Sequence, residues 1–139
     1  MGGHTMKGHA RNLMSEKVFA VGNDTPLAEI GRLLVLETVS GVPVIDGDER
    51  VIGFVSETDV LAALLRGESE DALARDVMSH PPIVADEFMA TDDVLGLLRQ
   101  AHIHHLPVVR DGVLVGIITP HDILRYYVER TLPPLPERA

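Results

Sequence analysis

Cysteine and tryptophan are absent from this chain of 139 residues, and the remaining aromatic side chains are scarce, at 3 Phe and 2 Tyr. The lack of cysteine excludes disulfide bonds, thiolate chemistry and zinc sites built on sulfur. The shortage of aromatic rings leaves little surface on which nucleic-acid bases could stack. A metal would therefore have to be held by histidine and carboxylate side chains alone.

Basic residues are also few, because 12 lysines and arginines stand against 21 acidic residues and give a formal net charge of -9. Phosphate backbones are bound by clustered basic side chains, so nucleic acid is not an expected partner. No apolar run reaches the roughly 18 residues that cross a bilayer, and residues 1–9 lack the apolar stretch of a secretion signal. We expect a cytoplasmic globular protein without a membrane partner.

A tandem repeat organises the rest of the sequence. The repeated blocks are residues 10–15 and 74–79, residues 42–45 and 106–109, and residues 53–59 and 116–122. The first two pairs are displaced by 64 residues (10 to 74) and the third by 63 (53 to 116), so the only gap falls in the turn between the second and third blocks. This conserved spacing predicts two homologous units, 10–67 and 73–131, with flexible tails at 1–9 and 132–139.

Each unit reads as a β-α-β-β-α sequence. Period-2 and period-3.6 apolar patterns indicate the elements. In order they are strands 18–21 and 83–85, a helix beginning near Leu27 and its counterpart near Val94, hairpin strands 42–45 and 51–55, and second helices 59–65 and 122–128. A unit of about 60 residues buries only ~60% of its unfolded surface, so the two units should pack together. The expected fold class is α+β, with one pseudo-twofold domain.

A hydroxyl residue followed three positions later by aspartate ends both hairpins, as Ser56 with Asp59 and Thr119 with Asp122. This spacing is typical of a capping box, in which the hydroxyl accepts from the amide three residues on and the acid bonds back. The same helix start can also hold a phosphate, with the aspartate accepting from ribose hydroxyls. The residues alone leave both interpretations open.

The whole pattern resembles the CBS-domain family, named after cystathionine β-synthase. The shared features are the tandem β-α-β-β-α pair, the apolar-Met-Ser blocks ending at Ser15 and Ser79, the apolar-Pro-Val strands and the doubled Gly-x-x-Ser/Thr-x-x-Asp signature. The resemblance spans residue 10 to about residue 130. It implies clefts between the repeats that bind adenosine compounds such as AMP, ADP, ATP or S-adenosylmethionine, no other cofactor, and frequent assembly into a homodimer.

The resemblance also implies particular ligand contacts. They are Ser56 and Thr119 near the phosphate, Asp59 and Asp122 on the ribose, and Val18, Phe19, Val42, Pro82, Ile83 and Leu106 against the adenine. Members that regulate kinases carry a His-Arg-x-Pro stretch whose basic groups meet phosphates. The chain has His104 and His105 there, which would make this charge depend on pH.

The two signatures are expected to bind phosphate unequally. We assign His104, His105 and His121 to the second signature, beside Asp122, where protonated imidazole would attract phosphate. The first signature carries Glu57, whose negative charge would repel it. The second cleft is therefore predicted to bind phosphorylated ligands more tightly.

The predicted function is a regulatory sensor module acting on an unidentified protein, and no catalytic residues are expected. The alternative is an interaction scaffold with vestigial clefts. A nucleotide hydrolase using His121 and Asp122 would lack a Gly-rich phosphate loop, a nucleophile elbow and a magnesium-binding acid cluster. A metal site at His102, His104 and His105 is disfavoured because adjacent residues point to opposite faces of a strand.

Overall fold

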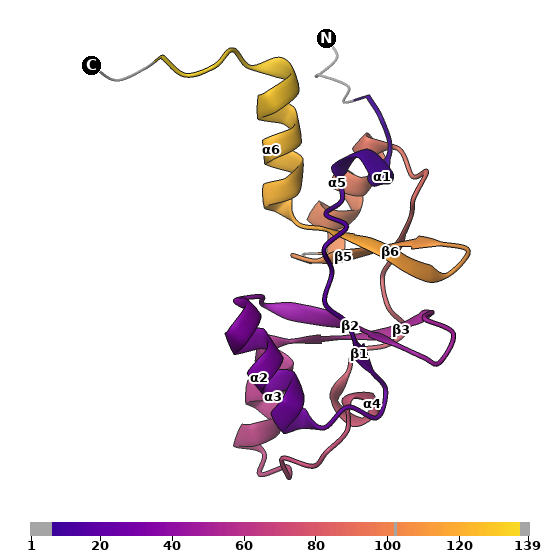
Figure 1. Ribbon diagram of the computed structural model, residues 1–139, viewed down its shortest axis with the longest axis vertical. Helices are drawn as coiled ribbons and strands as arrows, with labels where there is room; N and C mark the ends of the chain where they lie inside the picture. The colour runs from indigo at the N-terminus through magenta and orange to yellow at the C-terminus, as the bar shows by residue number, and fades with distance from the viewer. Residues whose placement is uncertain (1–6, 102, 137–139) are drawn as a thin grey trace.

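The computed structural model describes residues 7–101 and 103–136 (Figure 1). The elements of the first repeat are α1 (Ala10–Leu13), β1 (Val21–Gly22), α2 (Leu27–Glu37), β2 (Gly41–Ile45), β3 (Val51–Ser56) and α3 (Glu57–Leu65). Those of the second are α4 (Ala74–Val77), β4 (Ala85–Asp86), α5 (Thr91–Ala101), β5 (Leu106–Arg110), β6 (Val113–Ile118) and α6 (Pro120–Thr131). Helices and two small mixed sheets confirm the predicted α+β class.

The two sheets have the same topology. In the first, the central strand β2 runs parallel to β1 and antiparallel to β3, and β5 does the same between β4 and β6. Strand β1 is only two residues long and pairs with Val44 and Ile45. Pro43 therefore lies beyond the end of β1, where its missing N–H removes no bond from the sheet. Pro107 stands at the matching point before the two residues that pair with β4.

Element boundaries differ from the predictions in both first strands and in both second helices, and α6 spans Pro120–Thr131 rather than 122–128. Only Val21 of the predicted strand 18–21, and only Ala85 of 83–85, enters a sheet. Helix α3 begins at Glu57 rather than Asp59, because Ser56 caps it and Asp59 is its third residue. The short helices α1 and α4 were not predicted, since four residues are too few to display helical periodicity.

Each short helix is exchanged between the repeats. Ala10 and Leu13 of α1 are buried in the core of the second unit, with Val108 and Ile118. Ala74 of α4 is buried in the core of the first. Figure 1 accordingly shows α1 beside α5 and α4 beneath β1–β3. The two packed units therefore do not coincide with the two sequence repeats.

The segments that follow the exchanged helices form isolated antiparallel bridges with the hairpins of the opposite unit. Ser79 and Phe54 exchange backbone hydrogen bonds of 2.9 and 3.1 Å, and Ser15 and Ile117 exchange bonds of 2.9 and 3.0 Å. The methionine before each serine then packs directly over a signature glycine. A Cβ at Gly53 would collide with the sulfur of Met78. This contact explains why the methionine and the glycine recur together in both repeats.

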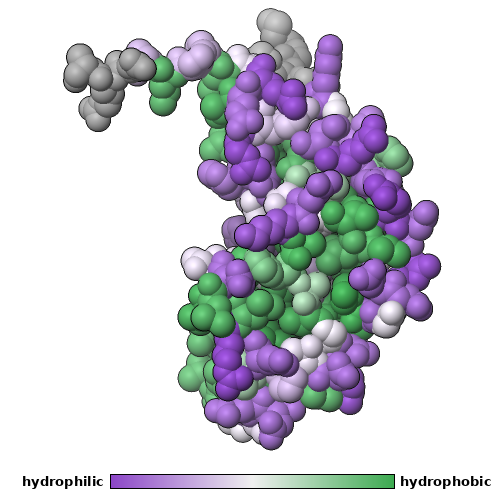
Figure 2. All heavy atoms as spheres, viewed as in Figure 1, coloured by the Kyte–Doolittle hydropathy of each residue, from purple (hydrophilic) through white to green (hydrophobic). Residues whose placement is uncertain are grey.

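A search of the described helices for one long and apolar enough to cross a membrane finds none. Figure 2 shows hydrophobic side chains gathered across the middle of one face, around the junction of the two units. The outline of the molecule narrows at the same level (Figure 2).

Candidate functional site

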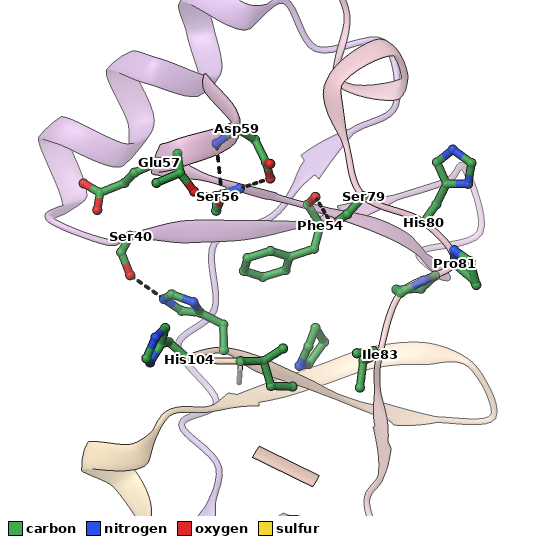
Figure 3. A pocket seen from close by; sticks show the side chains of 15 residues that line it. Ser40, Phe54, Ser56, Glu57, Asp59, Ser79, His80, Pro81, Ile83 and His104 are labelled. Carbon is green, nitrogen blue, oxygen red and sulfur yellow. Dashed lines mark hydrogen bonds between the residues drawn. The ribbon is translucent and has the colours of Figure 1, made fainter. Parts of the chain in front are cut away.

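A cavity of about 530 Å³ lies between the two units, and we call it the first-signature cavity. Its volume falls within the range of small-molecule sites, roughly 300–1,000 Å³. Its walls come mainly from three segments: the end of β3 with the start of α3, the extended segment that follows α4, and the turn before β5 (Figure 3). The lining residues are Ser40, Phe54, Ser56, Glu57, Thr58, Asp59, Ser79, His80, Pro81, Pro82, Ile83, Ile103, His104, His105 and Pro107.

Ser56 and Asp59 form the capping box that their spacing predicts. The Asp59 N–H donates to Ser56 Oγ at 3.1 Å, and the Ser56 N–H donates to Asp59 Oδ2 at 2.8 Å. Both side chains also line the cavity (Figure 3). The capping and ligand-facing interpretations are therefore compatible at this signature, because the cap engages one carboxylate oxygen and leaves Oδ1 directed elsewhere.

Phe54, which belongs to the first signature, and His105, which lies in the turn before β5, pack against each other in the cavity lining. Their ring centroids lie 5.3 Å apart with an interplanar angle of 30°. The Ser40 hydroxyl and Nε2 of His105 share a hydrogen bond of 2.5 Å, which fixes the imidazole. Burial lowers the pKa of His105 below its ordinary value of 6.5, the charge of His104 lowers it further, and Glu57 opposes them. His105 is therefore neutral at pH 7 and above.

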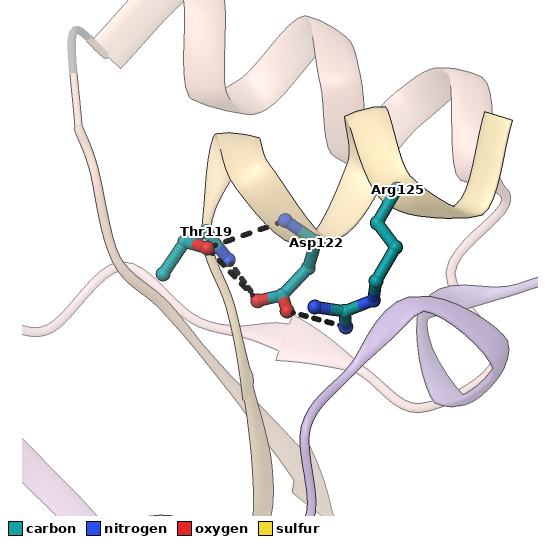
Figure 4. A network of polar contacts seen from close by, with 3 residues as sticks. All are labelled: Thr119, Asp122 and Arg125. Atoms are coloured by element: carbon teal, nitrogen blue, oxygen red, sulfur yellow. Dashed lines mark hydrogen bonds and ion pairs between the residues drawn. The ribbon is translucent and has the colours of Figure 1, made fainter. Parts of the chain in front are cut away.

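The second signature is arranged differently (Figure 4). Asp122 is 7% exposed, and its Oδ2 accepts from the N–H and the hydroxyl of Thr119 at 2.8 and 2.9 Å. Its Oδ1 accepts from Arg125 at 2.8 Å. Both carboxylate oxygens thus already have protein donors, so a ribose would have to displace Arg125 or share the carboxylate with it.

A smaller cavity of about 240 Å³, the second-signature cavity, lies beside Thr119. It is lined by Lys17, Val18, Phe19, Thr38, Val39, Ser40, Gly41, His105, Ile117 and Thr119. Ser40 and His105 line both cavities, so their hydrogen bond stands in the wall that separates them. Asp122 is not among the residues that line this cavity.

The histidines are distributed differently from the expectation. His104 and His105 line the first-signature cavity with Ser56 and Asp59, because the turn before β5 reaches the opposite unit, and His105 also lines the second-signature cavity with Thr119. His121 is exposed on α6 and lines neither cavity. The prediction that the second cleft binds phosphate more tightly stays a prediction, but its basis moves from these histidines to Lys17, which lines that cavity.

Two of the residues expected against the adenine have side chains that line neither signature cavity. Val42 and Leu106 are 1% and 0% exposed and belong to the two cores. Neither lines a signature cavity, because alternate residues of a strand face opposite sides and theirs face the helices. The predicted residues that do line the cavities are Val18, Phe19, Pro82 and Ile83, in two separate sets.

Phe54 is the main lining residue that sequence reasoning missed. Strand alternation could have found it: Gly53 and Val55 are buried toward the core, so Phe54 and Ser56 face the opposite side. Ser40 could not be found this way, because its role depends on a partner 65 residues away.

Among residues 7–101 and 103–136, no group of three metal-ligating side chains gathers. His102, the first member of the predicted metal cluster, lies outside the described residues. His104 and His105 alone do not provide a tetrahedral site.

Comparison with known proteins identifies the family. The CBS domain matches twice, at residues 10–66 and 74–129, so the chain belongs to the CBS-domain family and is a tandem CBS-domain protein. Protein MJ1225 of Methanocaldococcus jannaschii is 30% identical over 115 residues, which are 83% of this chain and 41% of that protein. A CBS domain-containing protein of Dictyostelium discoideum is 26% identical over 96% of this chain and 100% of its own length.

Inosine-5'-monophosphate dehydrogenase of Methanocaldococcus jannaschii is 29% identical over 84% of this chain, but only 23% of the enzyme is covered. The chain therefore spans less than half of MJ1225 and about a quarter of the dehydrogenase.

Solved structures agree on the fold. CBSX2 in complex with AMP superposes with a TM-score of 0.80, 28% identity, and coverage of 88% of this chain and 97% of the other. The structure of CBSX2 from Arabidopsis thaliana gives a TM-score of 0.84 at 26% identity, covering 93% and 100%. Both are pairs of CBS repeats, which confirms the predicted pseudo-twofold arrangement.

Proposed function

We propose that this protein is a non-catalytic regulatory module that binds adenosine-containing small molecules in its first-signature cavity. The observation that carries the proposal is a cavity of about 530 Å³ in which an aromatic ring and a signature carboxylate face a common space. The likeness to CBSX2, whose structure contains AMP, supports the choice of ligand class.

The lining offers a place for each part of adenosine. The Phe54 ring, with Pro82, Ile83 and Pro107, provides flat and apolar surfaces suited to a purine. The cap engages Oδ2 of Asp59, so Oδ1 can accept from a ribose hydroxyl. The second-signature cavity is smaller than typical ligand sites, so we assign the main binding event to the first.

The output of the module is proposed to pass through a partner or a second copy of the chain, in the cytoplasm. Helices α3 and α6 expose apolar side chains at corresponding positions, with Leu61 and Leu124 at 57% and 60% exposure and Leu65 and Val128 at 88% and 41%. Paired apolar faces of this kind favour a symmetric dimer. Sedimentation should give a dimer at tens of micromolar, and a monomer would contradict this part of the proposal.

The interaction scaffold remains the second candidate, and Asp122 favours it. Thr119 and Arg125 donate hydrogen bonds to the two oxygens of the Asp122 carboxylate. The second signature therefore acts as the N-terminal cap of α6. A scaffold would show this pattern at both signatures, whereas the first retains an open cavity.

Thermal unfolding with adenosine, AMP, ATP and S-adenosylmethionine tests the proposed function. A ligand present at 100 times its dissociation constant should stabilise the protein by ~2.7 kcal/mol. At least one adenosine compound should raise the melting temperature, while guanosine, as a control purine, should raise it less. No shift with any adenosine compound would favour the scaffold.

A further inference from the structure

Corresponding positions around the two signatures differ in charge. At three pairs the first signature is the more negative: Glu57 with Pro120, Ala62 with Arg125, and Pro81 with Lys17, the first-signature member being named first. At one further pair, His80 with Glu16, the carboxylate lies on the second-signature side. The repeats have therefore diverged in charge while keeping the same hydroxyl and aspartate positions.

The linings of the two cavities carry the same difference. Glu57 and Asp59 line the first-signature cavity, and among the described residues neither lysine nor arginine joins them. Lys17 lines the second-signature cavity, whose described lining contains no carboxylate. The hydrogen bond from Arg110 to Glu87 raises the pKa of Arg110, and the charge of Glu16, next to Lys17, adds to the same shift.

Two of the backbone N–H groups at the start of α3 that could bind an anion already donate hydrogen bonds within the protein. A helix N-terminus binds phosphate through its free N–H groups. Here the Glu57 N–H donates to the Ser40 carbonyl at 2.9 Å, and the Asp59 N–H donates to Ser56 Oγ at 3.1 Å. A phosphate at this point would compete with these bonds and would lie beside the Glu57 carboxylate.

The His105 imidazole does not offset these carboxylates at neutral pH. Burial lowers the pKa of His105 below its ordinary value, so this side chain is neutral there, and its Nε2 is engaged by Ser40. The carboxylates that face a ligand in this cavity are those of Glu57 and Asp59.

We propose that the first-signature cavity accepts adenosine compounds without a phosphate in preference to phosphorylated ones, and that Glu57 is the residue that sets this preference. The inference rests on the proposed function and adds the ligand class. Uncharged nucleosides and cationic adenosyl compounds fit the cavity, because Glu57 repels a phosphate and leaves a neutral ligand unaffected. The exposure of Glu57 limits the effect to about three- to tenfold in affinity.

Methyl NMR of the intact protein tests this proposal one cavity at a time. Of the two signature cavities, Ile83 and Ile103 line only the first, and Ile117 lines only the second. Ile103 also borders a separate cavity of about 830 Å³ between α5 and α6, so a site is assigned to the first-signature cavity only where Ile83 responds as well. Titrations with adenosine and AMP at pH 8 and low salt give separate dissociation constants at each reporter. Glu57→Gln removes the charge at nearly constant shape. Glu29→Gln is the matched control, since Glu29 also lies in the first turn of a helix but lines no signature cavity.

At Ile83 and Ile103, adenosine should bind at least three times more tightly than AMP in the wild-type protein. Glu57→Gln should strengthen AMP binding and so reduce the ratio of the AMP to the adenosine dissociation constant by at least half. Glu29→Gln should leave this ratio unchanged. Equal or tighter AMP binding at these reporters, or an unchanged ratio in Glu57→Gln, would overturn the inference while adenosine binding preserved the proposed function. If neither adenosine nor AMP shifted these methyl signals, the inference and the proposed function would both be refuted.

Discussion

The Ser40 hydroxyl lies 2.5 Å from Nε2 of His105, although 65 residues separate them in the chain. Both residues line both signature cavities, so this contact is shared between the two sites. It also holds a half-buried imidazole whose neutral form is favoured by burial. Stability and ligand binding should therefore both respond to this histidine.

The titration of His105 predicts that the protein loses stability as pH falls from about 7 toward 5. Because the folded pKa lies below the ordinary 6.5, the unfolded chain binds more protons in this window. The stabilisation is complete above pH 6.5 and is lost as pH falls through the folded pKa. His105→Gln should flatten this part of the profile in urea unfolding.

Replacement of the exposed His121 by Gln is the control for His105→Gln. It should leave the pH dependence of the unfolding free energy close to that of the wild-type protein. Parallel profiles for His105→Gln and the wild type would show that another group is responsible.

A second pH effect is expected at lower pH, from Glu87. This carboxylate is 5% exposed and accepts two hydrogen bonds of 2.8 Å from Arg110. The bonds from Arg110 hold the pKa of Glu87 below its ordinary 4.5, against the opposing effect of burial. Its contribution is present above pH 4.5 and is lost as pH falls through the folded pKa. Glu87→Gln should be less stable than wild type at pH 7, with the gap closing toward pH 3; a constant gap would contradict this account.

The methionine–glycine contact predicts a strong position dependence for glycine substitutions. Gly53→Ala should destabilise the protein by about 1–3 kcal/mol, because the new methyl meets the Met78 side chain. Gly31→Ala, within α2 and facing open space, should instead stabilise by about 0.5–1 kcal/mol. Chemical unfolding measures both, and similar values for the two variants would refute the assigned contact.

The exchange of α1 and α4 predicts that a single repeat does not fold. A fragment of residues 1–70 keeps Ala10 and Leu13 without the core they enter, and its own core lacks Ala74. Circular dichroism should show no cooperative melting for this fragment. A cooperative transition in the isolated fragment would show that the exchanged helices are dispensable.

The sequence was sufficient for features that depend on local chemistry. The hairpins, the long helices and both capping boxes follow from apolar spacing and the Ser/Thr-x-x-Asp pattern, and the structure contains them. The repeat spacing also indicated the pairing of two units. These features involve residues close together in the chain or repeated within it.

Features that depend on how the chain crosses between the two units could not be predicted from the sequence. The sequence assigns His104 and His105 to the second signature, but in the fold both line the first-signature cavity with Ser56 and Asp59, and only His105 also lines the second-signature cavity. The Arg125 contact with Asp122 was missed as well, although its i,i+3 spacing on a helix could have suggested it. Side-chain orientation in the strands likewise decided which predicted adenine contacts face a cavity.

Calorimetry with adenosine at pH 8 on three aspartate variants tests the central claim most directly. Asp59→Ala removes a carboxylate that lines the first-signature cavity and also caps a helix. Asp76→Ala removes a comparable capping carboxylate, bonded to the Leu73 N–H at 3.0 Å, away from both cavities. Asp122→Ala removes the aspartate of the second signature. Each variant is first shown to be folded, because the loss of a cap costs about 1 kcal/mol.

The account predicts that Asp59→Ala abolishes or weakens adenosine binding at least tenfold, whereas Asp76→Ala and Asp122→Ala bind it within about twofold of wild type. Adenosine binding that survives unchanged in Asp59→Ala, or is lost only in Asp122→Ala, would contradict the assignment of the ligand to the cavity formed by Phe54, Ser56 and Asp59.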